Sequence, residues 1–258
     1  MIVFPKGDGD VLETRCPKGG LMNTIVNVNS IAKSYGPVQV IHNCSFQIYE
    51  GEVYGLLGIN GAGKTTLMKM ILGLQRIDSG SIYVLGIKAG SSPEYLSNVG
   101  SVIETPSFYG HMNAEELLSM HLSYMQKKAD IAKTLQLVGL EHTGRKPISQ
   151  YSLGMKQRLG LARAIIHRPR LLILDEPLNG LDPIAITQMR ELMRRLTDQG
   201  VSILLSSHII GEIQHTADRI GILSGGSVKQ EFNTAEKVSE YGGQFEDYVV
   251  NLMKGESA

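Results

Sequence analysis

Apolar residues along this chain occur in two patterns that both predict β-strands. Alternating apolar and polar residues predict half-buried strands at 24–28 and 45–49. Continuous apolar runs predict buried strands in EVYGLL (52–57) and RLLILDEP (170–177). Further strands are predicted in GSIYVLG (80–86), VGSVIE (99–104) and VSILLSS (201–207), and a hairpin in RIGIL and SVKQEF around Ser224-Gly225-Gly226.

Helical spacing fills the segments between these strands. Asn113 with Glu116 forms a capping-box pattern at the start of a helix, and Asp182-Pro183 is typical of an N-cap followed by the first helical residue. Helices are predicted at 65–73, 113–125, 131–140, 152–167, 183–198 and 208–217, with two short ones in 234–253.

Strands that alternate with helices predict an α/β fold with a mainly parallel sheet, here with an antiparallel β part and a helical insert at about 105–165. Ligands of such sheets bind beyond the carboxyl ends of the strands. The main domain is predicted at 22–232, with a helical tail of unassigned role at 233–258. Residues 1–21 have no clear period and are interpreted as a flexible extension, or else the natural start is Met22.

Composition narrows the class of protein. The 258 residues are 42% hydrophobic and 19% charged, as in an ordinary globular protein. Lys plus Arg and Asp plus Glu number 25 each, so the basic excess that nucleic-acid binding favours is missing and no nucleic-acid partner is expected. The apolar runs are too short to span a bilayer. Cys16 and Cys44 are interpreted as free thiols in a reducing cytosol.

The segment GINGAGKT (58–65) follows a predicted buried strand and precedes a predicted helix. Its spacing, Gly58-x4-Gly63-Lys64-Thr65, is that of a phosphate-binding loop. Glycines let backbone N–H groups approach an anion, Lys64 adds a full charge for the β- and γ-phosphates, and the Thr65 hydroxyl can coordinate Mg²⁺. The alternative is an ordinary strand-to-helix turn with a surface lysine. The nucleotide-binding candidates are Asn60, Gly61, Ala62, Gly63, Lys64, Thr65 and Thr66.

A pair of acidic residues ends the predicted strand LLIL. Asp175 at the carboxyl end of that strand can hold a metal ion through water. Glu176, next in the chain, can orient and deprotonate an attacking water near a γ-phosphate. The alternative is a pair of turn residues, which the phosphate loop upstream makes less favourable.

Four further segments carry a resemblance. YSLGMKQRLGLARA (151–164), LLILDEP (171–177), NGLDP (179–183) and SSH (206–208) together resemble an ABC-transporter ATPase subunit over about 24–230. The resemblance implies a P-loop NTPase core of the ABC ATPase fold, with ATP and Mg²⁺ as cofactors and ATP hydrolysis as the reaction. It also implies that two chains sandwich two ATP molecules in a homodimer.

Residue roles follow from the resemblance at matching positions. Ser152, Gly154 and Met155 occupy the family's signature, usually LSGGQ, which reaches the partner subunit's ATP; Leu153 replaces a glycine and Met155 a glutamine. Asp182 matches the inter-subunit aspartate. His208 matches the histidine that contacts the γ-phosphate, and with Glu176 it is the predicted catalytic pair.

Two positions upstream of the signature complete the predicted site. Tyr35 in KSYG matches the aromatic that stacks on adenine; the alternative is a plain turn residue. Glu104 stands where the family normally has a glutamine, and we predict it as a third metal ligand beside Thr65 and Asp175. An ionised Glu only accepts hydrogen bonds, so it would attract Mg²⁺ and repel the γ-phosphate. The alternative is that Glu104 is a loop residue outside the site.

The Glu104 context, ETPSFYGHM, together with YSLGMKQRL, resembles a narrower group: ATPases of lantibiotic self-protection and bacitracin-resistance transporters in Gram-positive bacteria. That resemblance implies hydrophobic membrane permease subunits as partners, the cytoplasmic face of the membrane as location, and a peptide antibiotic as indirect cargo. The lantibiotic branch is favoured, with bacitracin as the alternative.

Two other functions compete with transport. A soluble ABC-type ATPase in translation or DNA repair shares the core, but factors of that kind usually carry two cores and a basic linker. This chain has one phosphate loop and a formal net charge of zero. A nucleotide switch without turnover is disfavoured because Glu176 and His208 are retained.

Overall fold

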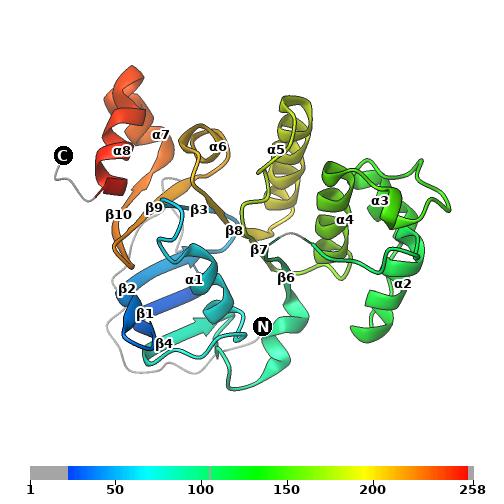
Figure 1. Cartoon of the computed structure of the whole chain (residues 1–258), viewed down its shortest axis with the longest axis horizontal. Helices are drawn as coiled ribbons and strands as arrows, with labels where there is room; N and C mark the ends of the chain where they lie inside the picture. The colour runs from blue at the N-terminus through cyan, green and yellow to red at the C-terminus, as the bar shows by residue number, and fades with distance from the viewer. Residues whose placement is uncertain (1–22, 105, 255–258) are drawn as a thin grey trace.

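The computed structural model describes residues 23–104 and 106–254, and within them the strands form two sheets (Figure 1). The predicted extension at 1–21 and Met22 lie outside the described residues. The strands are β1 (Thr24–Tyr35), β2 (Val38–Tyr49), β3 (Val53–Leu57), β4 (Ser79–Val84), β5 (Ile87–Lys88), β6 (Val99–Val102), β7 (Leu171–Leu174), β8 (Ser202–Ser207), β9 (Arg219–Ser224) and β10 (Ser227–Asn233).

The larger sheet has the order β10-β9-β3-β8-β7-β6. Strands β6, β7, β8, β3 and β9 run parallel, and β10 returns antiparallel to β9 as the predicted hairpin. Every residue of β3, β7 and β8 is buried, which explains why VYGLL, LLIL and the centre of SILLSS are apolar. Because β8 lies between β3 and β7, the carboxyl ends of these three strands meet at one edge of the sheet.

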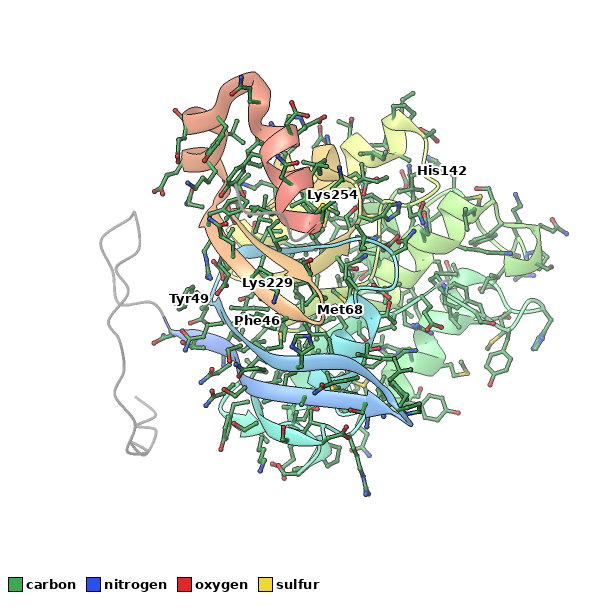
Figure 2. All side chains as sticks on the ribbon, turned by 60° about the vertical axis from the view of Figure 1, so that its left-hand side comes forward. Phe46, Tyr49, Met68, His142, Lys229 and Lys254 are labelled. Atoms are coloured by element: carbon green, nitrogen blue, oxygen red, sulfur yellow. The ribbon has the colours of Figure 1, made fainter. Side chains whose placement is uncertain are left out.

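The smaller sheet is antiparallel, in the order β2-β1-β4-β5. The sequence predicted only the first part of β1, which continues to Tyr35 through several register irregularities. The Phe46 ring on β2 stacks on the Tyr54 ring on β3, with 5.4 Å between centroids. Figure 2 shows the ribbon of this sheet below the β9–β10 hairpin, with Phe46 and Lys229 labelled in the two parts.

Arg219 on β9 joins charged groups where the two sheets meet. Its guanidinium donates to Glu52 Oε1 at 3.0 Å and to Glu231 Oε1 at 2.7 Å. The buried Tyr54 hydroxyl donates to the same Glu231 oxygen at 2.9 Å. Burial raises the pKa of the Glu52 carboxyl to about 7, against the opposing effect of Arg219.

Helices cover the larger sheet and also lie beside its two outer strands, β6 and β10. They are α1 (Lys64–Ile71), α2 (Ala114–Tyr124), α3 (Ile131–Leu137), α4 (Leu153–Ile165), α5 (Pro183–Asp198), α6 (Ile210–Gln214), α7 (Thr234–Tyr241) and α8 (Phe245–Lys254), with short 3₁₀ helices at Pro93–Asn98, Ile148–Gln150 and Gly242–Gln244. No helix in 23–104 or 106–254 has the length and apolar character that a membrane span requires.

Helices α2, α3 and α4 gather at one end of the molecule (Figure 1). The predicted capping box of α2 is present: Asn113 Oδ1 accepts from Glu116 N at 3.0 Å, and Glu116 Oε2 accepts from Asn113 N at 2.9 Å. Helix α4 lies directly against β6, because a Cβ on Gly100 would come within 2.0 Å of the Ala164 carbonyl oxygen. The helical group and the sheet therefore share one hydrophobic core.

Helices α7 and α8 lie beside β9 and β10 (Figure 1). Phe245 and Val249 on α8 are buried in the same core as the sheet, and the Ser224 hydroxyl on β9 donates to the Met253 carbonyl at 3.0 Å. The segment that the sequence left without a role thus covers the hairpin edge of the larger sheet.

Two histidines connect the helical group to the sheet. His121 Nε2 on α2 lies 3.4 Å from His167 Nδ1, and His167 Nε2 lies 3.2 Å from the Val99 carbonyl oxygen on β6. A hydrogen bond between two rings needs one unprotonated nitrogen. Burial lowers the pKa of His121 to about 4 and also lowers the pKa of His167. Both rings are therefore neutral near pH 7.

We predict that this pair makes stability fall in mild acid. Below about pH 6.5 an unfolded histidine takes up a proton, whereas folded His121 stays neutral down to about 4. The free energy of unfolding should therefore decrease as the pH drops from about 6.5 to about 4. Urea unfolding at several pH values should show a smaller decrease for His121→Asn than for wild type. His142→Asn is the control, since that side chain is 94% exposed; equal slopes for His121→Asn and wild type would contradict the prediction.

Candidate nucleotide-binding site

The glycine loop lies at the carboxyl end of β3 and leads into α1, as predicted. A Cβ on Gly58 would come within 2.5 Å of the Leu223 carbonyl oxygen. Gly61 and Gly63 have φ values of 83° and 103°, in the left-handed region that glycine adopts at low cost. Between them Ala62 N donates to the Ile59 carbonyl at 3.2 Å. Asn60 and Gly61 are exposed at the tip, and Thr66 lies in the first turn of α1.

Lys64 reaches back across its own loop. Its side chain is 5% exposed, and Nζ donates to the carbonyls of Gly58 at 2.7 Å and Ile59 at 3.2 Å. The same Nζ lies 3.4 Å from Glu176 Oε1. The loop thus holds a nearly buried ammonium group beside the N-terminus of a helix, which favours an anion such as a phosphate.

Asp175 is the point where three strand ends meet. Its Oδ2 accepts from the Thr65 hydroxyl at 2.7 Å and its Oδ1 from the Ser206 hydroxyl at 2.6 Å. Ser206 Oγ also accepts from Glu176 N at 3.0 Å. The sequence analysis quoted Ser206 in SSH without giving it a role. The sequence feature that could have indicated it is its place near the carboxyl end of a buried strand, β8, which lies between β3 and β7.

Glu176 lies between two cationic or polar partners. Its Oε1 faces Lys64, and its Oε2 is 2.9 Å from His208 Nδ1. Asn179 Nδ2 lies at 3.4 Å from the same Oε2. The backbone of Glu176 has φ 47°, an uncommon value for a residue with a side chain and one that occurs at functional sites. The predicted catalytic pair is therefore in direct contact.

A cavity of about 360 Å³ opens beside these groups. Thr65, Asp175 and Glu176 line it together with Glu104, and Leu153 at the start of α4 closes part of its wall. Gln157 on α4 donates to the Asn179 carbonyl at 2.8 Å, which fixes α4 against the loop after β7. Gln157 and Asn179 carry no role in the sequence analysis, because only the fold brings their segments together.

Glu104 lies at this cavity with a partner that the sequence analysis missed. Its Oε1 accepts from Lys69 Nζ at 2.6 Å. Lys69 follows Thr65 by four residues on α1, and this spacing places both on one helix face. The spacing could have indicated that Lys69 lies near the predicted metal ligands. The hydrogen bond that Lys69 donates to Glu104 raises the pKa of the Lys69 ammonium group.

The remaining predicted residues lie around this cluster. Tyr35 is 47% exposed at the end of β1, with Lys33 Nζ 5.5 Å from its ring centroid. Ser152 is the N-cap of α4 and accepts from Met155 N at 3.3 Å. A Cβ on Gly154 would lie 3.3 Å from Leu181 Cδ2.

The N-caps of α4 and α5, Ser152 and Asp182, do not contact the phosphate loop in the described part of the chain. Asp182 caps α5 by accepting from Ala185 N at 2.9 Å, as predicted. Within the part of the chain that the structure describes, no hydrogen bond joins Ser152 or Asp182 to the phosphate loop.

The oxygen donors at the cavity fit a magnesium ion. Thr65 Oγ1 and Asp175 Oδ2 are side by side, and Asp175 is 8% exposed. Mg²⁺ prefers oxygen ligands and is commonly held by one or two protein groups together with substrate phosphates. In 23–104 and 106–254 there is no cluster of three or more His, Cys, Asp or Glu residues suited to a metal ion. A site of this kind depends on the nucleotide to complete it.

Comparison with known proteins identifies the family to which this nucleotide-binding site belongs. The model of the ABC transporter family matches residues 41–179. The chain belongs to the ABC transporter family. A solved structure of an ATP binding subunit of an ABC transporter superposes with a TM-score of 0.79 at 30% identity, covering 89% of this chain and 99% of that chain. The predicted family, its α/β fold and its ATPase activity are confirmed.

Two curated relatives of this ABC ATPase have named transport roles. It is 42% identical over 214 residues to the bacitracin transport ATP-binding protein BcrA of Bacillus licheniformis, over 81% of this chain and 70% of BcrA. It is 39% identical over 219 residues to the lantibiotic transport ATP-binding protein SrtF of Streptococcus pyogenes, over 84% of this chain and 95% of SrtF.

We predict that Ser206→Ala slows ATP hydrolysis by about ten- to a hundredfold. The change removes one hydrogen bond to a carboxylate and one to Glu176 N, and bonds to charged groups contribute about 1.5–3 kcal/mol. Steady-state phosphate release measures the effect. Ser207→Ala is the matched control, because Ser207 Oγ contacts Glu212 and Ile209 instead. Equal rates for the two variants would show that Ser206 does not support the acid pair.

Proposed function

We propose that this ABC ATPase powers the export or membrane clearance of a peptide antibiotic, most simply a lantibiotic. The position of Glu176 between Lys64 and His208 supports the hydrolytic part of the proposal. The named roles of the relatives BcrA and SrtF support the cargo.

In the proposed reaction, the loop N–H groups and Lys64 bind the β- and γ-phosphates of ATP. Thr65 and Asp175 would hold Mg²⁺, which supplies positive charge to the phosphates when bound. The Glu176 carboxylate accepts one proton from the attacking water, and His208 holds that carboxylate through Oε2. Tyr35 offers a ring for the adenine at low entropy cost.

A second copy of the chain completes the site in this proposal. Ser152 caps α4 with its hydroxyl at the helix N-terminus, where an anion is favoured. Because Ser152 makes no hydrogen bond to the phosphate loop of its own chain in the described residues, we assign Ser152, Gly154 and Met155 to the ATP of a partner chain, with Asp182 at the interface between the two subunits. The homodimer would form in the ATP-bound state.

Membrane permease subunits are the second proposed partner. The transport roles of the relatives BcrA and SrtF support a membrane partner for this chain. The proposal places the ATPase at the cytoplasmic face of the membrane, held there through the permease. The helical group α2–α4 and the Glu104 loop would carry the change from the ATP site to that partner.

Bacitracin is the alternative cargo, and the comparison with BcrA supports it. The identity to BcrA is 42% and the identity to SrtF is 39%. A soluble role in translation or DNA repair has less support, since BcrA and SrtF are named as transport proteins.

Glu176→Gln should slow ATP hydrolysis by about 10²–10⁴-fold, the usual share of a general base. The amide keeps the shape of the side chain but cannot take the proton, so ATP should still bind and trap the dimer. Phosphate release and size-exclusion chromatography with ATP measure the two effects. Hydrolysis at the normal rate would assign the base to another group.

Lys64→Ala should remove tight ATP binding and, in the native host, resistance to the cargo. Survival of that host on a panel of lantibiotics and bacitracin, with the permease expressed, tests the cargo. Sensitivity to one class names it. Wild-type survival on every compound would remove the antibiotic proposal, while unchanged nucleotide affinity would remove the loop assignment.

A further inference from the structure

Lys69 is a second cation on α1, after Lys64, and it contacts Glu104, which lines the nucleotide cavity. It lies one helical turn after Thr65, and its Nζ donates to Glu104 Oε1 at 2.6 Å. Asp175 and Tyr35 also raise the pKa of the Lys69 ammonium group electrostatically, after the larger effect of Glu104. One ammonium group therefore stands close to the predicted metal ligands.

The carboxylate of Glu104 would otherwise add charge at a sensitive place. Glu104, Asp175 and Glu176 line the same cavity, and an ionised carboxylate repels both its neighbours and a γ-phosphate. A glutamine at position 104 would bring no charge. The contact with Lys69 offsets the charge of Glu104 and fixes the direction of its side chain.

The backbone at Glu104 also holds this position under strain. Glu104 has φ 60°, which residues with a side chain adopt rarely and at some cost. It lies two residues after the end of β6, at the start of the connection to α2. A side chain anchored there by Lys69 ties the helix of the phosphate loop to the segment that enters the helical group.

The Lys69–Glu104 pair is partly open to solvent. The side chains are 36% and 64% exposed, and exposed ion pairs stabilise a structure weakly. Such a pair holds a side chain in place without preventing its release. It can therefore exchange partners when nucleotide and metal arrive.

We propose that Lys69 is a positioning residue that presents Glu104 to the metal–nucleotide site, so that the two side chains together set how strongly Mg²⁺ promotes ATP binding. The inference rests on the proposed function of the site. It adds a residue that acts through Glu104 and does not itself touch the reacting atoms.

A double-mutant cycle tests the pair through binding alone. ATP affinity is measured by equilibrium titration over a range of Mg²⁺ concentrations for wild type, Lys69→Met, Glu104→Gln and the double variant. Each single change should shift the Mg²⁺ concentration for half-maximal ATP binding by about two- to fivefold, the range expected for an exposed ion pair. Two independent fixed charges would give shifts that multiply in the double variant. A pair in which one side chain positions the other gives a double shift that departs from this product.

Two further variants complete the test. Lys69→Arg should behave as wild type, because it keeps the charge and the donors. Lys237→Met is the matched control, since it breaks a Lys–Glu pair of 2.7 Å on α7, far along the chain from the site. Shifts that simply multiply, or a Lys69→Arg variant as impaired as Lys69→Met, would overturn the proposal. If wild type binds no Mg²⁺-dependent ATP, the proposed function itself fails, a result distinct from multiplicative shifts in a protein that binds normally.

Discussion

The carboxylate of Asp175 joins the segments at the carboxyl ends of three strands, where the nucleotide site lies. It accepts hydrogen bonds from Thr65, which follows β3 through the glycine loop, and from Ser206, which ends β8, while its own strand is β7. Three strand ends are thereby fixed to one group. A nearly buried carboxylate is costly unless its oxygens are hydrogen-bonded, and here both are. The positions of Lys64 and Glu176 depend on this arrangement, because Lys64 directly precedes Thr65 in the chain and Glu176 directly follows Asp175.

The same edge is connected to the helical group by more than one contact. Glu104 leaves β6 at the cavity with its side chain on Lys69, and Gln157 on α4 holds the loop that contains Asn179. Away from the cavity, His121 and His167 join α2 to β6 through neutral rings. Because these contacts lie on opposite ends of β6 and α4, the helices and the nucleotide site are linked as one body.

Much of the site was predictable from residues that are neighbours in the sequence. The glycine loop was recognisable from the spacing Gly58-x4-Gly63-Lys64-Thr65. The left-handed φ values of Gly61 and Gly63 show why glycine stands at these two positions. The helix caps Asn113 and Asp182 were also predictable, because a cap depends only on residues within one helical turn. The roles of Ser152, Tyr35 and Asp182 toward a nucleotide or a second subunit remain predictions, because a single chain does not contain the partner.

The sequence by itself determined the class of fold, the phosphate loop and the acid pair, because buried strands, glycine turns and capping residues act over a few neighbouring positions. Only the tertiary structure decided which distant groups meet. Ser206 reaches Asp175 because β8 inserts between β3 and β7, an order that no local pattern specifies. Lys69 reaches Glu104 because β6 ends beside α1, and α8 covers β9 because Phe245 and Val249 pack into the core of the larger sheet. These contacts depend on strand order and packing, which arise from the whole chain at once.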